Sequence, residues 1–291
     1  MIRKILKGLG IFIGIVVALL AGFYTKVYFS TESRFKKKYD ITLQALEIKP
    51  DSALLAEGQR LIAAKGCKDC HGADLSGKIF IDDPALGQVI AVNLTKGKGG
   101  LPADYNEQDW LKAMQHGLNR DNTTLKVMPS YEYTHFSEED MKAIIAYGMQ
   151  LPAIDNELPE THFKPVGRIL ADLDKLPVMV AEMIDHQKTL STNVVPEVSV
   201  PFGKYLAVSC TACHKENMQG GDPVVPGSPQ VANITSSGNV GKWTEEQFMT
   251  TLRSGVTPEG KTLPSQFMPW TMTKEYTDTE LKALYLYLRS I

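Results

Sequence analysis

The hydrophobic pattern of the chain occurs twice, in two long segments with an offset near 140 residues. Apolar residues within 141–145 are spaced i, i+3 and i+4, and those within 281–285 repeat this spacing. That spacing is typical of the buried stripe of a helix. Alternation of apolar and polar residues, the mark of a half-buried strand, is hard to find. The pattern therefore predicts an all-α chain with two copies of one small helical domain.

Capping residues mark the ends of several predicted helices. A first helix is predicted over residues 54–65. Asn106 with Asp109 can cap the start of a second helix. Gly117, directly after His116, is its stop signal. Ser137 begins the last helix of the first copy, and the second copy repeats these features over residues 203–209, at Thr244 with Gln247 before Gly255, and at Thr277 with Glu280.

A connector that is richer in proline separates the two copies. We place the first domain at residues 48–152, the connector at residues 153–196 and the second domain at residues 197–291. The connector pattern predicts a helix over residues 166–185 that is interrupted at Pro177. Its apolar residues indicate packing on one or both domains, with a peripheral membrane contact as the alternative.

A third hydrophobic segment lies at the N-terminus, where residues 8–24 carry no charge. As a helix this segment is about 26 Å long, close to the roughly 30 Å hydrocarbon core of a bilayer. A cleaved signal peptide is the alternative, but Leu19 stands where the cleavage site needs a small residue. We therefore predict a transmembrane anchor over residues 5–27. The basic run at residues 36–38 is expected to be part of a solvated tether behind it.

Composition narrows the chemistry that the chain can support. The chain has 291 residues and a formal net charge of -2, which fits two ordinary domains and lacks the basic excess of nucleic-acid-binding proteins. No nucleic-acid partner is expected. The chain has only four cysteines, and all of them belong to two short motifs.

Residues 67–71 and 210–214 both have the form C-x-x-C-H, the signature for attachment of haem c. Two thiols one helical turn apart can bond the two vinyl groups at one porphyrin edge, and the histidine that follows can bind the iron. A zinc site would need two such cysteine pairs in one small unit, and a thiol redox pair would need a β-α-β context. The predicted attachment residues are Cys67, Cys70, Cys210 and Cys213, and the predicted iron ligands are His71 and His214.

Met128 and Met268 are the candidates for the second iron ligand of each domain. Each precedes a proline and lies shortly before the last helix of its copy. Most methionines only fill cores, but the equal position in both copies favours a ligand role. His116 is expected to make a surface or propionate hydrogen bond, and His135, His162 and His186 are expected to be ordinary polar residues.

With these motifs, nearly everything after residue 50 resembles the bacterial class I cytochrome c family, specifically the membrane-bound dihaem cytochromes c. The resemblance implies two tandem class I domains, each a small helical fold around one covalent haem c with histidine and methionine ligands. It also implies that two Asn-x-Thr segments lie near the haem propionates. The alternative for these segments is a glycosylation sequon. The residues given this cofactor-binding role are Asn93, Thr95, Asn233 and Thr235.

An iron with two protein ligands has no open position for a substrate, so electron transfer is the function that remains. Since haem c is attached outside the cytoplasm, we expect a single-pass protein of the inner membrane with its haem domains in the periplasm. It is expected to relay electrons, without catalysis of its own, from a dehydrogenase or a quinol-oxidising respiratory complex to an acceptor such as a terminal oxidase.

Three alternatives stay open at this point. A dihaem peroxidase would need one iron with a releasable ligand, and a haem-based sensor would bind a gas such as carbon monoxide. The third alternative is an integral subunit of a respiratory or dehydrogenase complex. The chain also resembles parts of the cytochrome subunits of periplasmic alcohol and sugar dehydrogenases. Those typically carry three haem domains and a C-terminal anchor, whereas two domains and an N-terminal anchor are predicted here.

Overall fold

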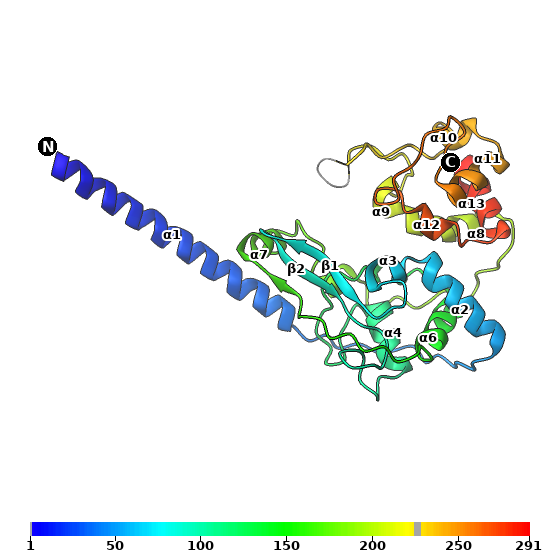
Figure 1. Cartoon of the computed structure of the whole chain (residues 1–291), viewed down its shortest axis with the longest axis horizontal. Coiled ribbons are helices and arrows are strands. Elements are labelled where there is room, and N and C mark those ends of the chain that lie inside the picture. The colour runs from blue at the N-terminus through cyan, green and yellow to red at the C-terminus, as the bar shows by residue number, and fades with distance from the viewer. Residues whose placement is uncertain (1, 224–227) are drawn as a thin grey trace.

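The computed structural model describes residues 2–223 and 228–291 and is mostly helical, as the sequence predicts. Figure 1 shows a long N-terminal helix that projects away from two helical domains, with the second domain against one side of the first. The connector runs along the first domain before the chain enters the second.

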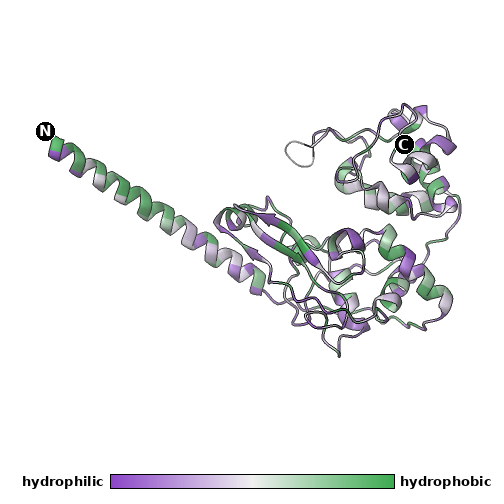
Figure 2. Ribbon diagram, in the orientation of Figure 1, coloured by the Kyte–Doolittle hydropathy of each residue, from purple (hydrophilic) through white to green (hydrophobic). Residues whose placement is uncertain are grey.

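Helix α1 (Ile2–Lys36) contains the predicted anchor and extends beyond it at both ends. Its apolar N-terminal part is exposed and gives the nearly continuous green stretch in Figure 2. Within the described residues, α1 is the helix that is long and apolar enough to cross a bilayer. It is therefore a candidate membrane anchor.

The last turns of α1 pack on the connector helix α7 (Pro165–Asp172), whereas the basic run at residues 36–38 is exposed, as expected of a solvated run. The buried residues of α1 are Val27, Thr31 and Phe35, which are spaced by four and share one face. The anchor thus enters the first domain as a packed helix. Its contacts include an Arg168–Glu32 ion pair at 2.9 Å, an Arg34–Glu182 ion pair at 2.6 Å and stacked rings of Phe35 and Phe163 with centroids 5.7 Å apart.

Two closely crossing helices form the frame of the first domain. Gly58 of α2 (Ser52–Ala64) lies against the backbone of Ala143 in α6 (Glu138–Gly148). A Cβ atom on Gly58 would come within 2.0 Å of the Ala143 oxygen, so only glycine permits this approach. The other helices of this domain are α3 (Cys67–His71), α4 (Glu107–His116) and α5 (Ser130–Tyr133).

The second domain repeats this crossing. Gly203 of α8 (Val200–Ala207) meets the oxygen of Ala283 in α13 (Asp278–Ser290), again with 2.0 Å for a Cβ atom. Each domain has its own apolar core, which includes the predicted stripe of its last helix. The remaining helices are η2 (Val208–Cys210), α9 (Thr211–His214), α10 (Asn239–Lys242), α11 (Glu245–Ser254) and α12 (Trp270–Thr273).

The predicted helix ends are confirmed where a cap defines them. Asn106 and Asp109 form a reciprocal capping box at the start of α4, and Gly117 ends that helix in the left-handed conformation, at φ 62°. The second domain uses the same devices. Thr244 and Gln247 cap α11, Gly255 ends it at φ 71°, and Thr277 and Glu280 cap α13.

A small antiparallel sheet in the first domain is missing from the sequence prediction. Its strands are β1 (Lys78–Asp83), β2 (Gly87–Ala91) and β3 (His162–Phe163), in the order β1-β2-β3. The third strand comes from the connector and has only two residues, which is too short to show alternation. The sheet ties the connector to the first domain.

The connector helix is shorter than predicted. Helix α7 ends at Asp172, and the 3-10 helix η1 (Val180–Met183) follows separately. Asp174 has a φ of 53°, a left-handed conformation through which an α-helix does not continue. The prediction of one helix interrupted only at Pro177 is therefore wrong.

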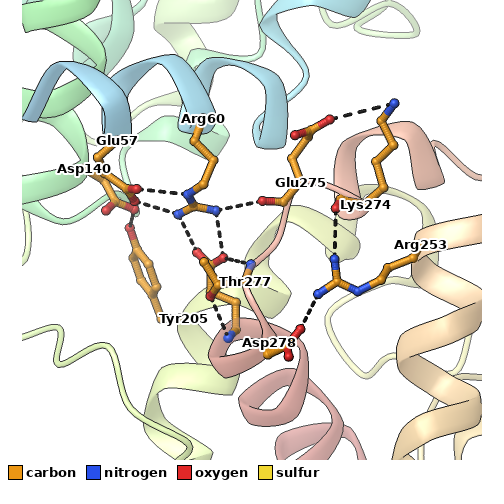
Figure 3. A network of polar contacts seen from close by, with 10 residues as sticks. Glu57, Arg60, Asp140, Tyr205, Arg253, Lys274, Glu275, Thr277 and Asp278 are labelled. Carbon is orange, nitrogen blue, oxygen red and sulfur yellow. Dashed lines mark hydrogen bonds and ion pairs between the residues drawn. The ribbon is translucent and has the colours of Figure 1, made fainter. Parts of the chain in front are cut away.

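Polar side chains join the two domains. Arg60 of α2 makes ion pairs with Glu57 in its own helix at 2.6 Å and with Glu280 of α13 at 2.8 Å. Tyr205 of α8 donates a hydrogen bond to Asp140 of α6. Figure 3 shows Arg60 and Tyr205 at this junction, each reaching a residue of the other domain.

Candidate haem-binding sites

Both C-x-x-C-H motifs form a single helical turn behind the first long helix of their domain. In the first domain, Gly66 leads into α3 with a φ of 75°, and in the second domain η2 leads directly into α9. Burial raises the pKa of Cys67 to about 12 and that of Cys210 to about 11. A thiol redox site needs a cysteine with a lowered pKa. The surroundings of these cysteines therefore argue against a thiol redox pair and agree with haem attachment.

The two motif histidines are held by the same hydrogen bond. Nδ1 of His71 lies 2.8 Å from the carbonyl oxygen of Val92, and Nδ1 of His214 lies 2.8 Å from that of Ala232. Since a carbonyl only accepts, Nδ1 carries the proton and Nε2 is left to bind a metal. Burial lowers the pKa of both histidines, which favours the neutral form that ligates iron. Such bonds orient metal-binding histidines in general.

The Asn-x-Thr segments form the turns that carry these carbonyl groups. Asn93 directly follows Val92, and its Oδ1 accepts hydrogen bonds from the backbone N–H of Thr95 at 2.9 Å and from the Thr95 hydroxyl at 2.8 Å. Oδ1 of Asn233 accepts the same two bonds from Thr235, each at 2.8 Å. Asn93 is 1% exposed, so the folded chain does not present it for glycosylation. For these residues the structure shows a fixed turn, and contact with a propionate stays a prediction.

A cavity of about 500 Å³ lies in the second domain, and the predicted haem residues form part of its wall. Cys210, Cys213, His214 and Met268 all line it. Two thiols, one imidazole and one thioether around an apolar space are the donor set that haem c requires, so the residues present fit this group. The other lining residues include Ile234, Val240, Trp243, Phe248, Leu284 and Leu288.

In the first domain, one attachment cysteine and the candidate methionine pack against the same core. Cys67 and Met128 both pack against the core cluster that contains Trp110, as Cys210 and Met268 pack against the core of the second domain. Both methionines form the same turn, in which the N–H two residues later donates to the methionine carbonyl, at 2.8 Å and 2.7 Å. The two methionines thus occupy equivalent places, and iron ligation by them stays a prediction.

Comparison with known proteins identifies the family. The family model described as Cytochrome c matches residues 55–152 and 203–291, one segment in each helical domain. The chain belongs to the cytochrome c family. It is a tandem cytochrome c, and membership of this family implies covalently attached haem c.

Relatives of this cytochrome are subunits of dehydrogenases. It is 24% identical over 286 residues to the fructose dehydrogenase cytochrome subunit of Gluconobacter japonicus, which covers 87% of this chain and 56% of that protein. It is 25% identical over 270 residues to the alcohol dehydrogenase (quinone) cytochrome c subunit of Gluconobacter oxydans, covering 83% and 55%. The gluconate 2-dehydrogenase cytochrome c subunit of Pantoea cypripedii is 35% identical over 104 residues, covering 34% and 23%. The chain spans about half the length of the first two relatives.

The sequence alone does not identify the groups that orient the histidines. Val92 and Ala232 act through their backbone carbonyls, so their residue types carry no signal. Only their position in the sequence could identify them, because each of these two residues directly precedes the asparagine of an Asn-x-Thr segment.

Of the two hydrogen bonds expected for His116, the surface one is wrong, and the propionate one stays a prediction. His116 is 1% exposed, and its Nδ1 lies 3.2 Å from Nδ1 of His186, so the two rings share a hydrogen bond between α4 and the connector. Burial lowers the pKa of His116 to about 4 and also lowers that of His186. Both are therefore neutral at pH 7, and the pair belongs to the packing of the connector.

Proposed function

We propose that this cytochrome is a membrane-anchored electron-transfer protein with two haem c groups, one in each domain, and without a catalytic activity of its own. The observation that carries the proposal is the cavity of the second domain, whose wall combines Cys210, Cys213, His214 and Met268. The first domain has the same histidine bond, the same Asn-x-Thr turn and the same methionine turn, which supports a second haem.

Each haem would be held by two thioether bonds to cysteines and by a histidine and a methionine as iron ligands. The bound group supplies a one-electron redox couple, whose potential a thioether ligand raises. The backbone bonds to Nδ1 orient the imidazoles, the apolar walls keep water out, and the Asn-x-Thr turns would support the propionate side. With two side chains as ligands, a peroxide or a substrate finds no open position. Cys67, Cys70, His71 and Met128 would hold the first haem, and Cys210, Cys213, His214 and Met268 the second.

We place the protein in the inner membrane with α1 as a single span and its N-terminus in the cytoplasm. The support is the exposed apolar surface of α1 together with the chemistry of haem c, which is attached outside the cytoplasm. Residues 48–152 and 197–291 would then be periplasmic haem domains, joined by residues 153–196.

We propose a dehydrogenase as the electron donor. The support is that the relatives above are cytochrome subunits of fructose, alcohol and gluconate dehydrogenases. A quinol-oxidising complex is the second candidate donor, and a terminal oxidase is a candidate acceptor. Confinement to the membrane by α1 would keep the carrier close to such partners.

The test is purification of the tagged full-length protein from detergent-solubilised native membranes. A dehydrogenase catalytic subunit should co-purify, and its substrate should reduce the haem absorption bands. The acid-extracted polypeptide should retain the mass of two haems. A polypeptide with the mass of the apoprotein, or rapid peroxide turnover by the purified protein, would contradict the proposal.

A further inference from the structure

Lys65 lies buried at the junction of the two domains. It is the C-cap of α2, two residues before Cys67, and only 8% of it is exposed. Burial of a lysine is rare because its charge loses hydration, so its surroundings must compensate.

An aromatic cage built by both domains surrounds the Lys65 ammonium group. Its Nζ lies 5.0 Å from the ring centre of Phe136 in the first domain. It lies 5.5 Å from the ring centre of Tyr205 and 5.9 Å from that of Tyr276, both in the second domain. Each distance is within the range at which a cation is attracted to a ring face. The cage therefore favours the charged form of Lys65.

Both haem-attachment motifs reach this cage. Lys65 precedes the first motif in sequence, and Ser209, which directly precedes Cys210, acts on the hydroxyl of Tyr276 against the rise of its pKa. Burial raises the pKa of the thiols of Cys67 and Cys210, and the charge of Lys65 acts against that rise at both of them. One cation is thus close enough to act on the attachment points of both domains.

The charged groups around Lys65 are mostly acidic. Burial lowers the pKa of Lys65, whereas the nearby carboxylates of Asp140 and Glu280 act in the opposite direction, and Arg60 acts with burial. Glu280 is already paired with Arg60. Asp140 accepts a hydrogen bond from Tyr205, as Figure 3 shows. Removing the Lys65 charge would leave negative charge at the junction.

We propose that Lys65 is a positioning residue for electron transfer, whose ammonium group favours the reduced state of both haems at once. The inference rests on the proposed function. Reduction adds an electron to each site, and a fixed positive charge in a water-poor junction stabilises that added charge. A single residue would then raise the reduction potentials of both haems together.

The test is a spectroelectrochemical titration of the purified full-length protein with Lys65→Met. At an effective dielectric constant of about 20, a unit charge roughly 12 Å away changes an equilibrium about tenfold. We expect a shift of that size toward the oxidised state in both haems, which is about 59 mV for a one-electron couple. Lys65→Arg should keep both potentials. Lys65→Gln is the second neutral variant and should behave as Lys65→Met does.

Lys78→Met is the matched control. Lys78 is exposed in β1, and its charge acts on Cys70 of the first domain. Solvent screening should limit its effect to less than about twofold, in one haem only. Folded, haem-loaded neutral variants with unchanged potentials, or with a shift in only one haem, would overturn the inference. The titration uses the purified protein without a partner, so its result does not depend on the identity of the donor. Failure of the proposed electron-transfer function would instead be seen as missing haem or as missing co-purification.

Discussion

Among single side chains, Met128 and Met268 carry the most specific untested role. If each is an axial ligand, the oxidised protein should show a weak methionine-to-iron charge-transfer band in the far red. Met128→Ala and Met268→Ala should each remove about half of that band and lower the potential of one haem, because a thioether favours ferrous iron. The measurement is an absorption spectrum of the oxidised protein with a redox titration.

Met183→Ala is the control for these variants, because Met183 is 49% exposed in the connector. It should leave the band unchanged. A band that survives in Met128→Ala combined with Met268→Ala would show that other groups ligate the irons.

The buried pair of His116 and His186 makes stability depend on pH. The pKa of His116 falls to about 4 on folding, so the unfolded chain binds more protons between that value and about 6.5. Stability should therefore fall as the pH drops through this range, by about 2 kcal/mol between pH 7 and pH 5. His116→Gln should flatten this dependence in urea unfolding measured at both pH values, whereas His162→Gln, at an exposed position, should keep it. An equal slope in both variants would contradict this assignment.

Among the elements, helix ends were predictable and short strands were not. Asn106, Thr244 and Thr277 mark their helices because a cap is a local device, read from residues three positions apart. β3 has two residues and is defined only by its pairing with β2, far away in sequence. The left-handed Asp174, which ends the connector helix early, likewise has no local signal as strong as a glycine.

The end of α1 is held by side chains that its apolar pattern does not reveal. Arg34 pairs with Asp174 and Glu182, both at 2.6 Å. Arg34→Met should free the last turns of α1, because two acidic partners lose their cation. We expect hydrogen exchange of the amides in residues 30–36 to rise about tenfold, measured by mass spectrometry in detergent. Lys36→Met, which removes an exposed pair with Glu32, should have little effect. Unchanged exchange in Arg34→Met would mean that apolar packing alone fixes the anchor.

For the two domains together, the repeat predicts each copy but not their contact. Residues that align between copies belong to a core, a cap or a candidate haem site, since both domains need them. The contact between the domains occurs only once in the molecule, so its residues need not repeat between the copies. In the sequence, Arg60, Lys65 and Tyr205 therefore look like ordinary polar or amphipathic helix residues. Their partners lie in the other domain, and no local pattern in either copy predicts these contacts.

The ion pair between Arg60 and Glu280 tests whether the domains are stabilised by each other. The Glu280 side chain is only 9% exposed, so Arg60→Met would leave a buried carboxylate without its cation. We expect a loss of about 3 kcal/mol in the free energy of unfolding, and an earlier urea transition of the second domain. Lys98→Met is the control, since its pair with Glu157 is largely exposed and should contribute less than about 1 kcal/mol. If both variants lose the same small amount, the junction contributes no more than an ordinary surface contact. A larger loss of unfolding free energy for Arg60→Met than for the control would mean that the contact between the two domains contributes to the stability of the fold.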